Sequence, residues 1–140
     1  MKNNIPELLF PSRGDFRMWL VENAETSNGV WLMFGKTKEV VTLTANDALE
    51  EALCFGWIDG QMRSIDDTKY RKYFARRRTK SVWSEKNKKT IETLRAKGSM
   101  TELGEKAVEM ANQNGTWDAP NDTSASDESK NARRPRDRDI

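Results

Sequence analysis

Apolar residues recur three or four positions apart in four segments of the chain, which is the spacing of one face of an α-helix. Each segment follows a Ser or Thr, and both residue types accept hydrogen bonds from the free N–H groups of a helix start. The first segment runs to about Glu25, and the other three end at a glycine that suits a left-handed helix end. The pattern therefore predicts four helices that begin after Ser12, Thr44, Ser84 and Thr101, the last three ending at Gly56, Gly98 and Gly115.

Three further segments have the character of strands. Residues 30–35 form a short apolar run whose length favours a buried strand. Residues 57–65 and 70–77 flank the sequence Asp66-Asp67-Thr68-Lys69, which is typical of a four-residue hairpin loop. We therefore predict an α+β fold, in which a small antiparallel sheet of about three strands, with one β-hairpin, is covered on one face by about four helices.

The composition changes after residue 117. Residues 118–140 contain no large apolar residue except Ile140, and Asp, Ser, Asn, Arg and Pro dominate. A segment of this kind cannot bury enough surface to offset the entropy lost on ordering. We expect one domain over residues 1–117 and a disordered polar tail over residues 118–140.

The overall composition is that of a soluble protein. The mean hydropathy is −0.87, and the N-terminal residues lack the apolar run of a secretory signal. No stretch approaches the ~20 apolar residues of a membrane span. The one cysteine excludes an internal disulfide and fits a reducing compartment, so we expect a cytoplasmic protein.

The absence of histidine limits the chemistry available. It removes Ser-His-Asp and Cys-His catalysis and the usual zinc and iron ligand sets. Cys54 lies at an apolar helix end with no base to activate it, which favours packing. The Asp66-Asp67 pair is a formal Mg²⁺ or Ca²⁺ candidate but is more typical of a turn. We expect no metal and no cofactor, and a non-catalytic protein is favoured.

The net charge of +2 hides an uneven distribution. Residues 1–68 carry 6 Lys or Arg against 11 Asp or Glu, whereas residues 69–98 carry 12 against 2, a net charge of +10. A positive electrostatic field that is confined to one part of a protein concentrates anionic ligands there. Arg95 and Lys97 suit the end of a helix, but Lys86, Lys88 and Lys89 lie near a helix start, where the helix dipole disfavours cations. Their position favours anion contact.

Basic residues alternate with aromatic residues over residues 70–78. Strand alternation places Tyr70, Lys72 and Phe74 on one face and Arg71 and Tyr73 on the other. Aromatic rings beside cations are the means by which proteins hold single-stranded nucleic acid. The alternative is a basic edge strand whose charges prevent aggregation. The predicted anion or nucleic-acid contacts are Lys69, Arg71, Lys72, Arg77, Arg78, Lys86, Lys88 and Lys89.

A second candidate site surrounds the first hairpin strand. Trp57 and Asp59 share a face at strand period, and Arg63, four residues further on, is expected there too. Trp83 and Asn87 are one turn apart at a helix start, where backbone N–H groups can hold an anion. The predicted ligand-binding set is Trp57, Asp59, Arg63, Arg76, Trp83 and Asn87. The alternatives are a structural Asp59–Arg63 ion pair and a packing role for Trp83.

Several sequence blocks carry a family resemblance. They are residues 16–20, 29–32, 52–60, 63–66, 81–84, 98–101 and 115–117, and the most specific is Ala52-Leu53-Cys54-Phe55-Gly56-Trp57-Ile58-Asp59-Gly60. Through them the chain resembles the YdeI/OmpD-associated (bacteriocin-protection) family of small bacterial proteins. The resemblance implies a compact α+β protein linked to envelope stress and bacteriocin tolerance, and it implies no catalytic residues.

Three functions follow from these features. The first is a non-catalytic stress-protection protein whose basic surface meets an anionic ligand or an acidic partner surface. The second is a nucleic-acid-binding module that uses residues 70–78. The third is an enzyme with Asp59 as general acid or base.

Overall fold

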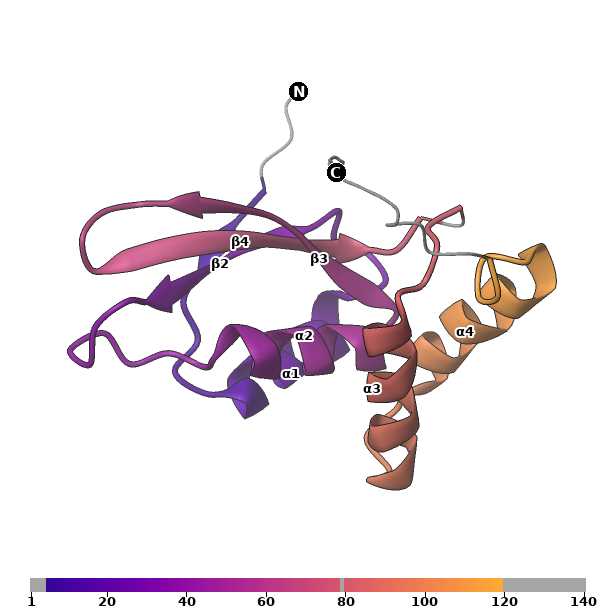
Figure 1. Cartoon of the computed structure of the whole chain (residues 1–140). Coiled ribbons are helices and arrows are strands. Elements are labelled where there is room, and N and C mark those ends of the chain that lie inside the picture. The colour runs from indigo at the N-terminus through magenta and orange to yellow at the C-terminus, as the bar shows by residue number, and fades with distance from the viewer. Residues whose placement is uncertain (1–4, 79, 120–140) are drawn as a thin grey trace.

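The computed structural model describes residues 5–78 and 80–119 and shows an α+β fold (Figure 1). Within these residues the elements are β1 (Glu7–Leu8), α1 (Arg13–Asn23), β2 (Val30–Gly35), α2 (Ala45–Cys54), β3 (Trp57–Ser64), β4 (Lys69–Arg76), α3 (Glu85–Ala96) and α4 (Glu102–Asn114). The predicted tail lies outside the described residues, apart from residues 118 and 119. No helix in the described part of the chain is long and apolar enough to span a membrane.

The helix boundaries follow from local capping, as predicted. The side chains of Ser12, Thr44, Ser84 and Thr101 each accept a hydrogen bond from the backbone N–H three residues later. Helix α4 ends at Gly115, whose φ of 84° is left-handed and favours glycine.

The sheet has four strands in the order β1-β2-β4-β3 within the described residues. Strand β1 is parallel to β2, and the β2–β4 and β3–β4 pairs are antiparallel. The prediction of about three strands in an antiparallel sheet is therefore wrong in detail, since β1 makes the sheet mixed. Strand β4 lies between two partners, so the interpretation of its charges as protection of an edge strand is also wrong.

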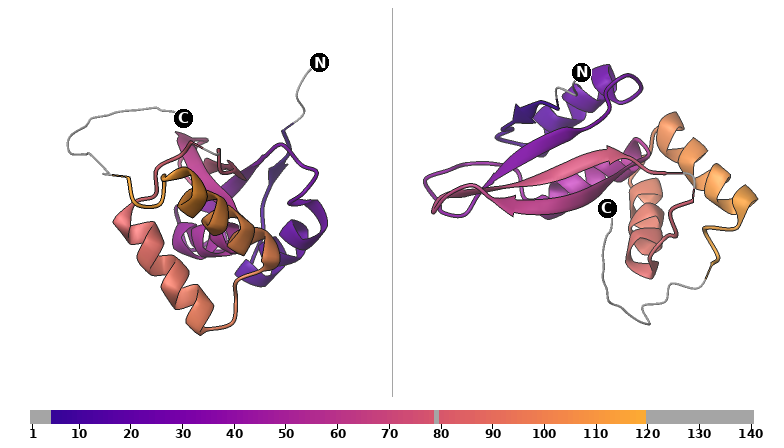
Figure 2. Two further views of the ribbon diagram at one scale, coloured as in Figure 1. Left: turned by 90° about the vertical axis from the view of Figure 1, so that its right-hand side faces the viewer. Right: turned by 90° about the horizontal axis from the view of Figure 1, so that it is seen from above.

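The core lies between one face of the sheet and helices α1 and α2, and it continues to Ile91 and Leu94 of α3 and to Val108 and Ala111 of α4. Strand β2 alternates buried and half-buried residues, and its buried Val30, Leu32 and Phe34 lie opposite Phe74, Lys72 and Tyr70 of β4. Phe16 of α1 packs edge-on against Phe74 at 5.8 Å. We call this side the covered face. Seen from the side of the sheet that lies opposite to these two helices, the strands lie in front of α2 (Figure 2, right).

The opposite side of the sheet is the open face, defined by Trp31, Met33, Arg63, Arg71 and Tyr73. Register places Trp31 opposite Tyr73, and Arg63 opposite Arg71. No described helix covers this side in either view (Figures 1 and 2). Among the described elements, α1 and α2 therefore cover one face of the sheet and leave the other without a helix (Figures 1 and 2).

A β-bulge in β3 decides which residues reach the open face. Asp59 lies opposite Phe74, but Met62 lies opposite Lys72, so the step from one pair to the next takes three residues on β3 and two on β4. The extra residue reverses the alternation, because successive strand residues point to opposite sides. Arg63 therefore faces the open side, and the prediction that it shares a face with Asp59 is wrong.

Candidate functional site

The two tryptophans of the predicted ligand site belong to the core. Trp57 is fully buried, its indole N–H donates to the carbonyl oxygen of Ala24 at 3.1 Å, and its ring meets that of Trp19 at 5.7 Å. Trp83 is 2% exposed and packs against Trp117 at 5.0 Å. Neither indole presents a face to a ligand, and for Trp83 this agrees with the packing alternative.

Arg77 completes the packing around Trp83. Its guanidinium carbon lies 3.9 Å from the ring centroid, and Nη2 donates to the carbonyl oxygen of Val82 at 3.3 Å. Burial lowers the pKa of Arg77 to about 10, while the nearby charge of Asp59 opposes that shift. This arginine therefore holds Val82 and Trp83 close to the end of β4.

The polar members of the predicted ligand site are dispersed. Asp59 forms an ion pair with Lys72 at 2.9 Å, so Lys72 takes the place predicted for Arg63. Arg76 donates to the carbonyl oxygens of Ala24 and Ser27, at 3.0 and 2.6 Å, and fixes the end of α1. Asn87 contributes its backbone N–H to the Ser84 cap. The structure does not bring the predicted set together.

Acids neutralise several of the predicted anion contacts. Lys69 pairs with Asp66, Lys88 with Glu85, and Arg71 with Glu7. Asp66 also accepts from the backbone and hydroxyl of Thr68, and these hydrogen bonds lower its pKa, as expected for a turn. The side chains of Arg78, Lys86 and Lys89 are exposed. Exposed positive charge therefore remains on Arg78, which follows β4, and on Lys86 and Lys89 of α3.

The open face carries a compact group of rings and guanidinium groups. The rings of Trp31 and Tyr73, on the two central strands, have centroids 5.3 Å apart. The guanidinium carbon of Arg71 lies 4.2 Å from the Trp31 centroid, and that of Arg63 lies 5.9 Å from it. Glu7 pairs with Arg71 from the neighbouring strand β1. We call Trp31, Arg63, Arg71 and Tyr73 the open-face cluster.

A glycine makes room for the tyrosine of this cluster. A Cβ at Gly29 would clash with the hydroxyl oxygen of Tyr73. The hydroxyl donates to the carbonyl oxygen of Asn28 at 3.3 Å. The phenol ring is therefore held at one place on the sheet.

Sequence reasoning missed Trp31, because residues 30–35 are apolar throughout and predict only a buried strand. The signal that was present is the strand period, which separates Trp31 and Met33 from Leu32 and Phe34.

A second charged cluster, also missed, joins α1 to α2. Glu51 is only 6% exposed, and its carboxylate accepts from Arg13 at 2.8 Å and from Arg17 at 2.9 Å. Arg13 also pairs with Asp47 and Glu50. We call these five residues the helix clamp. Every guanidinium group in it faces a carboxylate, which is the arrangement of a structural ion network.

Cys54 lies beside the clamp. It is fully buried, and burial raises the pKa of its thiol, although a hydrogen bond with Arg17 opposes that shift. A buried thiol with a raised pKa is a poor nucleophile. Cys54 is therefore a packing residue.

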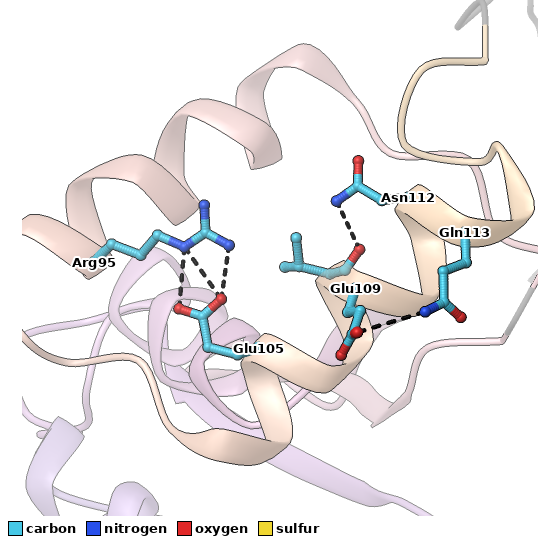
Figure 3. A pocket seen from close by; sticks show the side chains of 6 residues that line it. Arg95, Glu105, Glu109, Asn112 and Gln113 are labelled. Carbon is cyan, nitrogen blue, oxygen red and sulfur yellow. Dashed lines mark hydrogen bonds and ion pairs between the residues drawn. The ribbon is translucent and has the colours of Figure 1, made fainter.

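A shallow groove of about 540 Å³ runs between α3 and α4 (Figure 3). Two nitrogens of Arg95 donate to the carboxylate of Glu105 at its lower end, and Gln113 donates to Glu109 further along. These polar side chains therefore form hydrogen bonds with one another. Across residues 5–78 and 80–119, no three acidic or cysteine side chains group as metal ligands.

Comparison with known proteins identifies a family. The family model described as Domain of unknown function (DUF8412) matches residues 8–107, which include all four members of the open-face cluster. The chain belongs to this family. The resemblance to the YdeI/OmpD-associated family is therefore wrong, because the matching family is unrelated to it. No curated protein and no solved structure matches the chain.

Proposed function

We propose that this protein is a non-catalytic binding protein that holds an anionic partner on the open face of its sheet. The observation that carries the proposal is the convergence of Arg63 and Arg71 on Trp31, on a face that no described helix covers. Of these two guanidinium groups, that of Arg71 pairs with the carboxylate of Glu7, and that of Arg63 has no carboxylate partner among the described residues. The surplus of positive charge attracts anions.

Arg78 and Lys80, which follow β4 in the chain, are also exposed. They add positive charge to this part of the chain, and positive charge attracts anions.

A binding titration tests the proposal. The probe is fluorescently labelled inorganic polyphosphate, followed by anisotropy at low and at moderate salt. The protein should bind at low salt and release the probe as salt rises, because exposed charges are screened. The double variant Arg63→Gln/Arg71→Gln should bind more weakly and show a shallower salt dependence, because each arginine that pairs with a phosphate contributes about one unit to the log–log slope.

The matched control removes the same charge elsewhere. Lys97 caps the C-terminal end of α3, which points away from the sheet (Figure 1), and Lys106 is an exposed residue of α4. The Lys97→Gln/Lys106→Gln variant should retain most of the affinity. Equal losses in the two double variants, or no binding by the parent protein at low salt, would contradict the proposal.

A further inference from the structure

We propose that the anionic partner of the open face is a single-stranded nucleic acid, whose bases stack on Trp31 and Tyr73 while its phosphates pair with Arg63 and Arg71. The inference rests on the proposed function, since it names the partner of the same surface. It depends on the rings of the cluster, which an anion without bases would not use.

The first argument is the position of the rings. Trp31 and Tyr73 are register partners on β2 and β4, the two strands in the middle of the sheet. Both are half-buried, so each ring is supported by the sheet and still reaches solvent. Tyr73 is further fixed by its close contact with Gly29. Adjacent, preorganised rings on an uncovered sheet suit successive unpaired bases.

The second argument is the mixture of rings and guanidinium groups. Arg71 lies over the Trp31 ring at 4.2 Å. An arginine held in this way offers a flat surface for a base and N–H donors for a phosphate. An acidic protein surface would use the charges but gain little from the rings. A DNA duplex would present phosphates, but its bases are already stacked on one another.

The third argument concerns Glu7, the acid of β1 that pairs with Arg71 of the cluster. Glu7 accepts from Arg71, and its side chain is 47% exposed. A phosphate approaching Arg71 competes with this carboxylate for the same guanidinium group. Removing the acid should therefore strengthen binding of the nucleic acid, which would not follow if Arg71 served only to stabilise the sheet.

The test compares three labelled probes by fluorescence anisotropy. They are an oligothymidylate of about 12 nucleotides, an abasic oligomer of equal length and charge, and a duplex of that length. The oligothymidylate should bind most tightly. Trp31→Leu and Tyr73→Leu should each weaken its binding by about 5- to 150-fold, the loss of one stacked base, and should leave abasic binding nearly unchanged.

Two controls accompany these variants. Met110→Ala alters an exposed apolar residue of α4 and should not change binding. Glu7→Gln keeps both rings and should tighten binding of the oligothymidylate several-fold. If Trp31→Leu fails to fold, Tyr73→Leu and the comparison of oligothymidylate with the abasic oligomer still decide the matter.

The outcomes separate the two proposals. If abasic and normal oligomers bind equally, or the duplex binds as well as the single strand, the partner is a generic polyanion. Nucleic-acid binding is then overturned while anion binding stands. Unchanged oligothymidylate binding in both ring variants also overturns it. Failure of every probe and of polyphosphate to bind at low salt removes both proposals.

Discussion

On the covered face of β4, Phe74 is fully buried against α1 and Lys72 is paired with Asp59, whereas on the open face Tyr73 and Arg71 lie beside Trp31 within reach of solvent. The two sets alternate along one strand. The same strand therefore carries core residues on one face and half-buried aromatic and basic residues on the other.

The helix layer behind the covered face differs from the open face in how its charges are matched. Each arginine of the helix clamp faces carboxylates, and the buried Glu51 uses both of its oxygens. On the open face, Arg71 pairs with Glu7, and Arg63 donates to the amide oxygen of Gln61. Both arginines of the clamp are therefore matched by carboxylates, whereas Arg63 has no ion pair among the described residues.

The largest expected effect on stability comes from substitutions at two neighbouring residues of β4, one on each face of the sheet. Phe74→Ala should lower the free energy of unfolding by about 3–5 kcal/mol, because it leaves a cavity in the core. Tyr73→Ala should cost about 1–2 kcal/mol, since its ring is half-buried. Urea unfolding followed by circular dichroism measures both. Equal losses would break the comparison, because both faces would then contribute equally to stability.

The next effect concerns the helix clamp. Glu51→Gln should cost about 2–3 kcal/mol of stability, because it leaves Arg13 and Arg17 without their shared carboxylate. The loss is below that of a fully buried pair, since the arginine side chains are 39% and 33% exposed.

Glu50→Gln is the matched control for the clamp, because it changes a single carboxylate on the same helix that is more exposed than Glu51. It should cost under about 1 kcal/mol. If Glu50→Gln destabilises as much as Glu51→Gln, the burial of Glu51 does not matter and the clamp acts as a surface network. Neither change should alter anion binding at the open face.

The smallest expected effect is the contribution of the exposed ion pair between Arg95 and Glu105 to stability. The hydrogen bonds from Arg95 lower the pKa of Glu105 below its ordinary value of 4.5. The resulting stability is fully present above the ordinary value and is lost as pH falls through the lowered one. Glu105→Gln should cost about 0.2–1 kcal/mol at neutral pH, since both side chains are over 40% exposed.

Urea titrations at several pH values check this prediction. The stability gap between parent and variant should close as Glu105 becomes protonated. Arg95→Gln should show the same closure, because it removes the other half of the pair. A gap that persists well below the ordinary glutamate value would mean that the side chains contribute through packing.

Local rules were enough to predict the helices. Ser12, Thr44, Ser84 and Thr101 cap them because a cap depends on the next three residues only. Strand β1 was missed because two residues leave no periodic pattern, and its pairing is with residues 31 and 32.

The candidate site was harder to predict because it depends on register. Trp31 meets Tyr73 across 42 positions, and Arg63 reaches the open face only through the bulge, which is defined by the partner strand. The helix clamp was missed for a similar reason, because it depends on how two helices pack. The spacing of Arg13 and Arg17 on one helix complements that of Asp47 and Glu51 on another, but only the packing of α1 on α2 brings the four together.

The bulge of β3 also makes it possible to separate the shape of this surface from its charge. Deleting Gln61 would leave two steps on each strand between the Asp59–Phe74 and Met62–Lys72 pairs, and Arg63 would still lie opposite Arg71. A bulge bends its strand and increases the local twist, so the shortened strand would run straighter beside β4. The surface would then keep every cation and ring but lose curvature, which is a property that no side-chain substitution can isolate.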